Sequence, residues 1–445
     1  MSSQFRPVGA VRSHDPHAHL VFVRGSGHQL WDSNGRPYID FIGGYSALNF
    51  GHAHPRLVGA ANDQLLKLSF CTGANSHLRA ELEQLLAGVV SESSLIRSLP
   101  PDANDGNEHL LRPTLTSEKK LLKVWLSSTG ARAVEVAWKI AVANRSGNLM
   151  RFDLSYHGRS LATAHISDTN RSDALLGFPY PLINNIEPDS LIPFPRCGSQ
   201  CDGLCMECDS SIAVATRWLE RNSQSTSAVI LEPAIGARGY YFACSKYYRR
   251  LIRLVRTYDL LVISDEVQMG LGRLGSLVAS HAEGWFPDLV VFGKSLGGGI
   301  APISAVVGDA KLMDQLPNGI ESETFGANPL ACRVAIEVLS MLDDKVFLEQ
   351  VRINGQRFRQ SLRSGLPNKC TVDGIGMCSV VDLSLFGHDS IDTSWQWVCG
   401  LREQGLLVHL TGTHRNRIAI IPPLNVDTDT LGHVANILSE FWKNR

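Results

Sequence analysis

The sequence predicts an α/β protein with a mostly parallel central sheet in a large domain and a smaller α+β domain after it. Two short apolar runs, at 260–263 and 289–292, are continuous rather than alternating. Continuous runs are typical of strands buried on both faces of a parallel sheet. At 445 residues the chain exceeds one simple core, so roughly two to three domains are expected. A change to helices alternating with short strands near 325–335 indicates a domain boundary there.

Local signals place the first elements of the chain. Residues 20–41 read as two short strands around a turn at 32–35. Pro55 opens a helix, and the apolar spacing of residues 76–90 predicts an amphipathic helix. Residues 91–120 are polar, contain prolines and lack periodicity, so a long surface loop is expected there.

The same signals place the remaining elements. The predicted strands are 122–126, 149–153, 161–166, 227–231, 379–383 and 417–421, and the predicted helices are 131–144, 245–257, 331–343, 347–364, 393–404 and 427–442. We expect an N-terminal segment that joins the small domain (1–60), a large cofactor-binding domain (61–328) and a C-terminal small domain (329–445).

Composition and charge narrow the classes of partner. The 42 basic and 43 acidic residues give a net charge of −1, so no bulk field attracts nucleic acid or an anionic membrane. No segment reaches the ~18 apolar residues that span a bilayer, and the N-terminus lacks the apolar core of a secretory signal. Ten scattered cysteines fit a reducing compartment. We therefore expect a cytoplasmic enzyme.

Four of the cysteines lie close together in a loop rich in glycine and proline. They are Cys197, Cys201, Cys205 and Cys208, with the spacing C-x3-C-x3-C-x2-C. Four thiolates suit a structural zinc ion, but this spacing differs from that of paired CxxC knuckles. The sequence favours reduced loop cysteines and no metal, with zinc as the alternative.

An acid and a lysine follow the two apolar runs. Asp265 and Glu266 come after the first run, and Lys294 comes after the second. Open α/β sheets bind ligands outside the carboxyl ends of their strands, so these side chains predict a site. The glycines at 270, 272 and 275 have the spacing of a dinucleotide fingerprint but lie five residues beyond the strand end. A P-loop ending at Lys294 fails because its first glycine is missing.

A lysine-bound aldehyde cofactor fits better. A lysine forms a Schiff base when its amine is partly neutral, and a pyridinium nitrogen needs a carboxylate partner such as Asp265. The turn at 127–130, between a strand and a helix, offers backbone N–H groups to a phosphate. Tyr156 is an aromatic side chain able to stack on a ring. Together these residues predict a pyridoxal phosphate site.

Extended motifs carry a family resemblance. They are GHAHP at 51–55, SSTGARAVE at 127–135, YHGR at 156–159, EP at 232–233, DEVQMGLGR at 265–273, GKSLGGG at 293–299, TFGANP at 324–329 and PPL at 422–424. The chain resembles the class III, or ω-amino-acid, aminotransferases of the fold type I pyridoxal phosphate superfamily. The resemblance covers about nine-tenths of the chain in the right order, which supports the whole fold rather than one motif.

The resemblance implies a role for each matching residue. Lys294 would form the Schiff base and then act as the catalytic base, and Asp265 would pair with the pyridine nitrogen. The other implied cofactor contacts are Thr129, Gly130 and Ala131 at the phosphate, Tyr156 and Val267 on either side of the ring, and His157, Glu232 and Gln268 around it. Thr324 would reach the phosphate of a neighbouring subunit, which implies a homodimer with composite sites.

Two departures from the family pattern bear on affinity and substrate. Ala131 and Arg132 stand where Ser or Thr and then Glu are usual, so one hydroxyl donor is lost. Many members that use glutamate carry an arginine and a glutamate at the positions of Ala419 and Ala237. The glutamate screens the arginine, and the pair acts as a switch for glutamate and 2-oxoglutarate. We expect this switch to be missing here. The candidates for contact with an amine or amino-acid substrate and its oxo-acid or aldehyde partner are Tyr45, Arg238 and Arg417.

Two alternatives remain open. Racemases and epimerases use the same scaffold and cofactor but need no oxo acid. A non-catalytic regulatory subunit would also retain the fold, although it has no need of both Lys294 and Asp265. The aminotransferase is the leading prediction.

Overall fold

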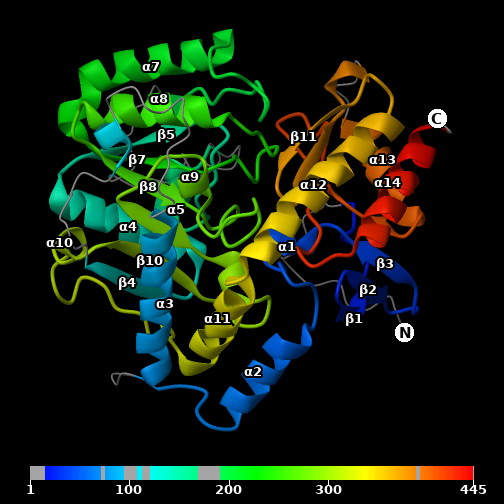
Figure 1. Ribbon diagram of the computed structural model, residues 1–445, viewed down its shortest axis with the longest axis horizontal. Coiled ribbons are helices and arrows are strands. Elements are labelled where there is room, and N and C mark those ends of the chain that lie inside the picture. Colours follow the sequence, from blue (N-terminus) through cyan, green and yellow to red (C-terminus); the bar gives the residue numbers. More distant parts are fainter. Residues whose placement is uncertain are drawn as a thin grey trace.

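The computed structural model describes residues 16–71, 76–94, 108–112, 121–168, 191–386 and 391–443. Figure 1 shows two lobes, a large one with the central sheet and a smaller one that carries the first strands and the last helices. Both drawn ends of the chain lie on the smaller lobe. Within the described ranges, no helix has the length and apolar character needed to cross a membrane.

The large lobe is built on a seven-stranded sheet. Across the sheet the strands are β4 (Leu122–Ser127), β10 (Ser304–Asp309), β9 (Leu289–Phe292), β8 (Leu261–Asp265), β7 (Thr226–Leu231), β5 (Asn148–Phe152) and β6 (Leu191–Ile192). β10 runs antiparallel to its two neighbours, and the other neighbouring pairs are parallel. The predicted, mostly parallel sheet is confirmed.

Helices cover both faces of this sheet. Those of the large lobe are α2 (Pro55–Leu65), α3 (His77–Ser94), α4 (Gly130–Asn144), α5 (Leu161–Ile166), α7 (Met206–Asn222), α8 (Ser245–Arg256), α9 (Ala279–Ala282), α10 (Ala310–Met313) and α11 (Pro329–Leu342). Along β8, Leu261 and Ile263 join the core beneath α4, whereas Val262 joins the core beneath α7 and α8. Because both faces are buried, the strand reads as one continuous apolar run.

The strand predicted at 161–166 was wrong, because these residues form α5. The Ser160 side chain caps the helix by accepting a hydrogen bond from Thr163 N at 3.3 Å. Residues 91–120 also differ from a plain loop: α3 continues to Ser94, and Glu108–Leu111 forms a 3-10 turn. The rest of that predicted loop, at 95–107 and 113–120, lies outside the described residues.

The smaller lobe holds two four-stranded sheets. One is antiparallel and contains β11 (Thr371–Ile375), β12 (Cys378–Asp382), β15 (Arg417–Ile420) and β14 (His409–Thr411); the other contains β1 (Phe22–Ser26), β2 (Gln29–Asp32), β3 (Pro37–Asp40) and β13 (Leu406–Leu407). β13 pairs with β3 in parallel, so the N-terminal strands join C-terminal residues. The helices of this lobe are α12 (Lys345–Gly365), α13 (Ile391–Glu403) and α14 (Thr428–Lys443), and the short α1 (Gly43–Ser46) follows β3. The domain limits at 60 and 328 remain a prediction.

Arg273 ties the lobes together behind the predicted site. Its guanidinium is fully buried and donates to Met377 O at 2.9 Å, Pro422 O at 2.6 Å and Asn49 Oδ1 at 2.7 Å. Burial lowers the pKa of Arg273 to about 10, so the group stays charged near neutral pH. The turn after β8 is thereby fixed against both the N-terminal segment and the small lobe.

Candidate active site

Three charged side chains converge at the carboxyl ends of neighbouring parallel strands. Glu232 follows β7, Asp265 ends β8, and Lys294 begins the 3-10 turn η5 (Lys294–Gly297) two residues after β9. The strands lie side by side in the sheet, so these ends share one edge. This is the edge at which open α/β sheets bind ligands.

Asp265 is held from two sides. Its Oδ2 lies 2.8 Å from Nδ1 of His157, and its Oδ1 accepts a hydrogen bond from Val267 N at 3.1 Å. A carboxylate only accepts, so Nδ1 of His157 carries the proton. The neighbouring acid, Glu266, is used differently: it accepts from the N–H groups of Ala279 and Ser280 at the start of α9. Only Asp265 of the two belongs to the site.

Lys294 reaches the site from a strained backbone. Its φ is 42°, in the left-handed region that non-glycine residues seldom adopt, and such outliers cluster at functional sites. Its Nζ donates to Gln268 Oε1 at 2.9 Å, and Gln268 Nε2 donates to the Tyr240 hydroxyl at 2.6 Å. Burial lowers the pKa of Lys294 to about 8 despite the opposing charges of Asp265 and Glu232. At pH 7 about a tenth of the amine is then neutral, far more than in a lysine of ordinary pKa.

Glu232 lies behind the loop that carries Tyr156. Its two carboxylate oxygens accept from Tyr156 N at 2.8 Å and Gly236 N at 3.1 Å. Burial, with a smaller contribution from the neighbouring Asp265, raises the pKa of Glu232 to about 7. The contacts orient the tyrosine backbone and the loop after β7, which places Glu232 in a supporting position.

The predicted phosphate turn lies at the N-terminus of α4. Thr129 caps the helix, its side chain accepting from Arg132 N at 3.3 Å. A Cβ on Gly130 would lie 2.8 Å from Cγ1 of Val267, so only glycine permits this approach to the end of β8. The side chain of Arg132 forms ion pairs with Glu321 and, at 3.3 Å, with Glu135. It therefore does not replace the hydroxyl donor absent at Ala131.

A cavity of about 270 Å³ opens over Lys294. Its lining residues are Tyr45, Tyr156, Arg159, Ala237, Arg238, Gln268, Lys294, His409, Leu410, Thr411, Gly412 and Arg415. Arg159 and His409 were not predicted from the sequence, because the segments that carry them meet only in the folded chain. One sequence feature could have pointed to Arg159, which is the last residue of the YHGR motif at 156–159.

The cavity separates the predicted substrate residues. Tyr45 and Arg238 line it, and the ring of Tyr45 meets that of His409 edge-on at 4.8 Å. Arg417 is not a lining residue: its guanidinium lies 3.9 Å from the ring centroid of Tyr241, and its Nε lies 3.4 Å from Asp382 Oδ2. Thr324 is exposed and also lies outside the lining.

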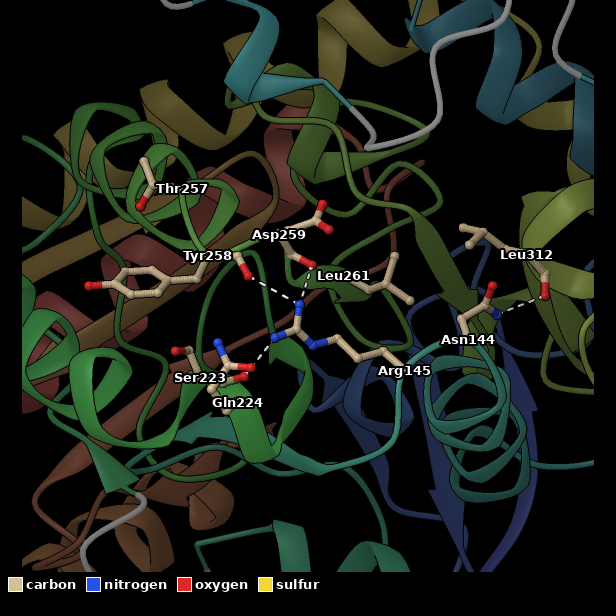
Figure 2. A pocket seen from close by; sticks show the side chains of 9 residues that line it. All are labelled: Asn144, Arg145, Ser223, Gln224, Thr257, Tyr258, Asp259, Leu261 and Leu312. Atoms are coloured by element: carbon tan, nitrogen blue, oxygen red, sulfur yellow. Dashed lines mark hydrogen bonds between the residues drawn. The ribbon is translucent and has the colours of Figure 1, made fainter.

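A wider hollow of about 800 Å³ lies at the opposite edge of the sheet, where β5, β7 and β8 begin. Figure 2 shows Arg145 at its centre, with hydrogen bonds to the carbonyls of Ser223, Tyr258 and Asp259 at 2.8, 3.2 and 3.0 Å. These contacts join the loops before the strands. The lining of this hollow therefore includes none of Glu232, Asp265 and Lys294.

The residues present fit pyridoxal phosphate. Asp265 is a buried carboxylate for a pyridinium nitrogen, and Lys294 is a lysine whose pKa is lowered. Tyr156 lines the cavity beside Lys294. The N-terminus of α4, where helix geometry leaves backbone N–H groups without intrahelical partners, contacts Val267 next to Asp265. A carboxylate, an amine, an aromatic ring and an anion site are thus gathered at one edge.

Comparisons with known proteins agree with this chemistry. The chain is 31% identical to the 5-aminovalerate aminotransferase DavT of Pseudomonas aeruginosa over 430 residues, covering 95% of this chain and 93% of the relative. It is 31% identical to the 4-aminobutyrate aminotransferase GabT of Escherichia coli over 434 residues, with 95% and 93% covered. These relatives support an aminotransferase and give no support to the racemase alternative.

Solved structures and a family model agree as well. A structure of ornithine aminotransferase from Toxoplasma gondii, with PLP at partial occupancy, matches with a TM-score of 0.77 and 27% identity, covering 98% of this chain and 92% of that one. The fold is therefore that of the fold type I enzymes, and pyridoxal 5'-phosphate is the cofactor. The family model for class-III aminotransferases matches residues 10–441. This chain belongs to the class-III aminotransferases.

Proposed function

We propose that this aminotransferase takes its amino group from an ω-amino carboxylate and passes it to a short 2-oxo acid, with Lys294 as the reacting lysine. The observation that carries the proposal is the cavity over Lys294, whose walls bring three arginines, Arg159, Arg238 and Arg415, around one amine. The relatives named for 5-aminovalerate and 4-aminobutyrate support a substrate of the same class.

Lys294 would hold the cofactor and then move the proton at the reacting substrate carbon. Its lowered pKa leaves much of the amine neutral near pH 8, and only the neutral amine is a nucleophile or a base. Gln268 accepts from Nζ at 2.9 Å and so orients the amine. Pyridoxal phosphate supplies the electron sink that makes the substrate carbon acidic.

Asp265 would keep the pyridine nitrogen protonated. A buried carboxylate stabilises an adjacent cation strongly, because little water screens the pair. His157 and Val267 N fix the two carboxylate oxygens. Val267 and Tyr156 would lie on opposite faces of the ring, with Glu232 holding the Tyr156 backbone from behind.

Thr129, Gly130 and Ala131 would bind the cofactor phosphate at the N-terminus of α4. The helix dipole and the first backbone N–H groups favour an anion there. The missing hydroxyl at Ala131 removes one donor to a charged group, worth about 1.5–3 kcal/mol. Arg132 does not replace this donor, because it pairs with Glu321 and Glu135. The backbone N–H groups would therefore supply a larger share of the phosphate-binding energy than in family members that have the hydroxyl.

The substrate carboxylate would be bound by Arg238 and Arg415 rather than by Arg417. Both line the cavity, and Arg238 also donates to Asp168 O at 2.7 Å, which fixes its guanidinium. His409 stands opposite Ala419 across the β14–β15 pair and lines the cavity. It therefore adjoins the position where the family's switch arginine would stand. Ala237 stands where the same family members carry the glutamate that pairs with this arginine, so both residues of the pair are absent. We therefore propose a pyruvate-like acceptor in place of 2-oxoglutarate.

We further propose a homodimer with composite active sites. Phe325 is 61% exposed, and its ring centroid lies 4.8 Å from that of Phe70, which forms an apolar surface. The same loop touches the phosphate turn, because Glu323 Oε1 accepts from Ser128 N at 2.9 Å. A second copy packed on this surface would bring Thr324 of the partner subunit towards the phosphate.

We also propose a cytoplasmic location. None of the ten cysteines, all of which lie within the described ranges, forms a disulfide, and this suits a reducing compartment. Cell fractionation with a compartment-specific marker tests this, and recovery of the enzyme from an oxidising compartment would contradict it.

A panel of amines and oxo acids tests the reaction. We expect 4-aminobutyrate or 5-aminovalerate with pyruvate to give the highest kcat/KM, and an amine of equal length without a carboxylate to be much poorer. A kcat/KM for 2-oxoglutarate about tenfold above that for pyruvate would refute the proposed acceptor. Inversion of an amino acid without any oxo acid would refute the aminotransferase itself.

A further inference from the structure

The four clustered cysteines come together in space. Cys197 and Cys201 lie in the loop between β6 and α7, Cys205 is the N-cap of α7, and Cys208 is buried in its first turn. All four Sγ atoms lie within 4.8 Å of one another. Cys208 Sγ is 3.5 Å from that of Cys197 and 4.0 Å from that of Cys201. From the spacing alone, a four-thiolate site was the alternative to reduced loop cysteines without a metal.

The cluster has the dimensions of a tetrahedral metal site. A zinc–thiolate bond of about 2.3 Å sets the edge of a regular S4 tetrahedron at about 3.8 Å. The two separations from Cys208 Sγ, 3.5 and 4.0 Å, lie on either side of that value, and the remaining sulfur pairs lie within 4.8 Å. A polynuclear iron–sulfur cluster distributes its cysteines over several iron atoms and needs a wider set of sulfurs.

The backbone around the sulfurs suits thiolates. Gly203 N donates to Cys201 Sγ at 3.3 Å. Gly203 has φ +80°, and a Cβ there would lie 2.5 Å from Cβ of Lys246, so glycine is required for the loop to turn against α8. Cys205 is the N-cap of the 17-residue helix α7 and Cys208 lies in its first turn, where the dipole favours negative charge.

We propose that Cys197, Cys201, Cys205 and Cys208 bind one structural zinc ion through four thiolates. Zinc accepts four thiolates without redox chemistry, and a closed tetrahedron leaves no position for a substrate. None of the four cysteines lines the cavity over Lys294. The ion therefore stabilises the fold and takes no part in amino transfer.

The loop that the ion closes connects the two lobes. Ser199, between the first two cysteines, donates from N and Oγ to the Asp373 carboxylate on β11 of the small lobe, the Oγ contact being 2.5 Å. From the other side, Arg250 on α8 donates to Gly203 O at 2.6 Å. Zinc would fix the loop that makes both contacts, so its removal should weaken the contact between the two lobes.

Metal analysis of the purified holoenzyme tests the proposal directly. We expect about one zinc per chain in wild-type protein grown with zinc, and a roughly tenfold lower content in Cys201→Ser and Cys208→Ser. Cys399→Ser is the matched control, because Cys399 lies on α13 outside the cluster, and it should keep its zinc. Stripped protein that takes up cobalt should show the intense visible bands of tetrahedral thiolate coordination.

Several results would overturn the proposal. Wild-type holoenzyme with full activity and no bound metal would do so, whether the four thiols are reduced or paired as disulfides. Iron in place of zinc would also overturn it, as would zinc that persists in both cluster variants. These measurements on the wild-type chain remain decisive even if a cysteine variant fails to fold.

Discussion

The Nδ1 atom of His157 lies 2.8 Å from the Oδ2 atom of Asp265, and both side chains are buried. The histidine comes from the loop after β5, and the acid ends β8. This contact fixes the carboxylate in place before any cofactor arrives. His157 is therefore a positioning residue for the group proposed to face the pyridine nitrogen.

Removal of this contact should slow turnover without preventing cofactor binding. His157→Leu leaves one oxygen of a buried carboxylate without its donor, a loss of about 1–3 kcal/mol, or roughly ten- to hundredfold in kcat. His157→Asn keeps a donor near the Nδ1 position and should recover most of the activity. Steady-state kinetics with the pH dependence of kcat checks both variants. Equal kcat in wild type and His157→Leu would contradict this role.

The lowered pKa of Lys294 should set the pH at which the apoprotein captures its cofactor. Only the neutral amine attacks an aldehyde, so the rate of capture should rise as pH increases through about 8. With an ordinary pKa of 10.5 the rise would come more than two pH units higher. Stopped-flow absorbance of the apoprotein mixed with pyridoxal phosphate measures the profile. A rate still climbing steeply above pH 10 would show that burial does not act on this amine.

Arg238→Ala should weaken binding of the substrate carboxylate. Loss of one hydrogen bond to a charged group is worth about 1.5–3 kcal/mol, so KM for 5-aminovalerate should rise about ten- to hundredfold. The same variant should treat pentylamine much as the wild type does, because that amine has no carboxylate. Arg417→Ala should leave the ratio between these two amines unchanged, since Arg417 contacts Tyr241 and Asp382 outside the cavity. The opposite pattern would place the carboxylate at Arg417.

The sequence predicted the convergence of Asp265 and Lys294 better than it predicted the walls of the cavity over Lys294. Asp265 and Lys294 were predictable because each follows a continuous apolar strand, and neighbouring parallel strands end at one edge. His409 and Arg415 lie in segments whose approach to Lys294 depends on how the small lobe packs, which no local pattern encodes. Arg417 looked equally suitable in sequence, and strand alternation puts it on the same face as Ala419, but its guanidinium stacks on the ring of Tyr241 instead of lining the cavity.

Two other outcomes have similar causes. Residues 162–166 alternate apolar and polar side chains like a strand, yet the cap at Ser160 favours the helix that forms. The four cysteines have an irregular spacing, and their approach depends on the turn of the loop and on the first turn of α7. A side-chain cap decided the first outcome, and the packing of the cysteine loop against α7 decided the second.

A charge on the apolar surface at Phe325 should separate the proposed dimer. Phe325→Asp puts a carboxylate into the expected interface, so the chain should become monomeric and bind its cofactor more weakly. Leu385→Asp is the matched control, because Leu385 is 62% exposed, against 61% for Phe325, but lies in the small lobe. Light scattering with absorbance of the bound cofactor checks both. A dimer that persists in Phe325→Asp with full cofactor content would contradict the composite site.

The most direct test of the central claim is to locate the lysine that holds the cofactor. The holoenzyme is reduced with borohydride, digested, and mapped by mass spectrometry. We predict one pyridoxyl group per chain, on Lys294, and none in Lys294→Ala treated in the same way. A pyridoxyl group on a different lysine, or none in an enzyme that still transfers amino groups, would contradict the assignment of this site.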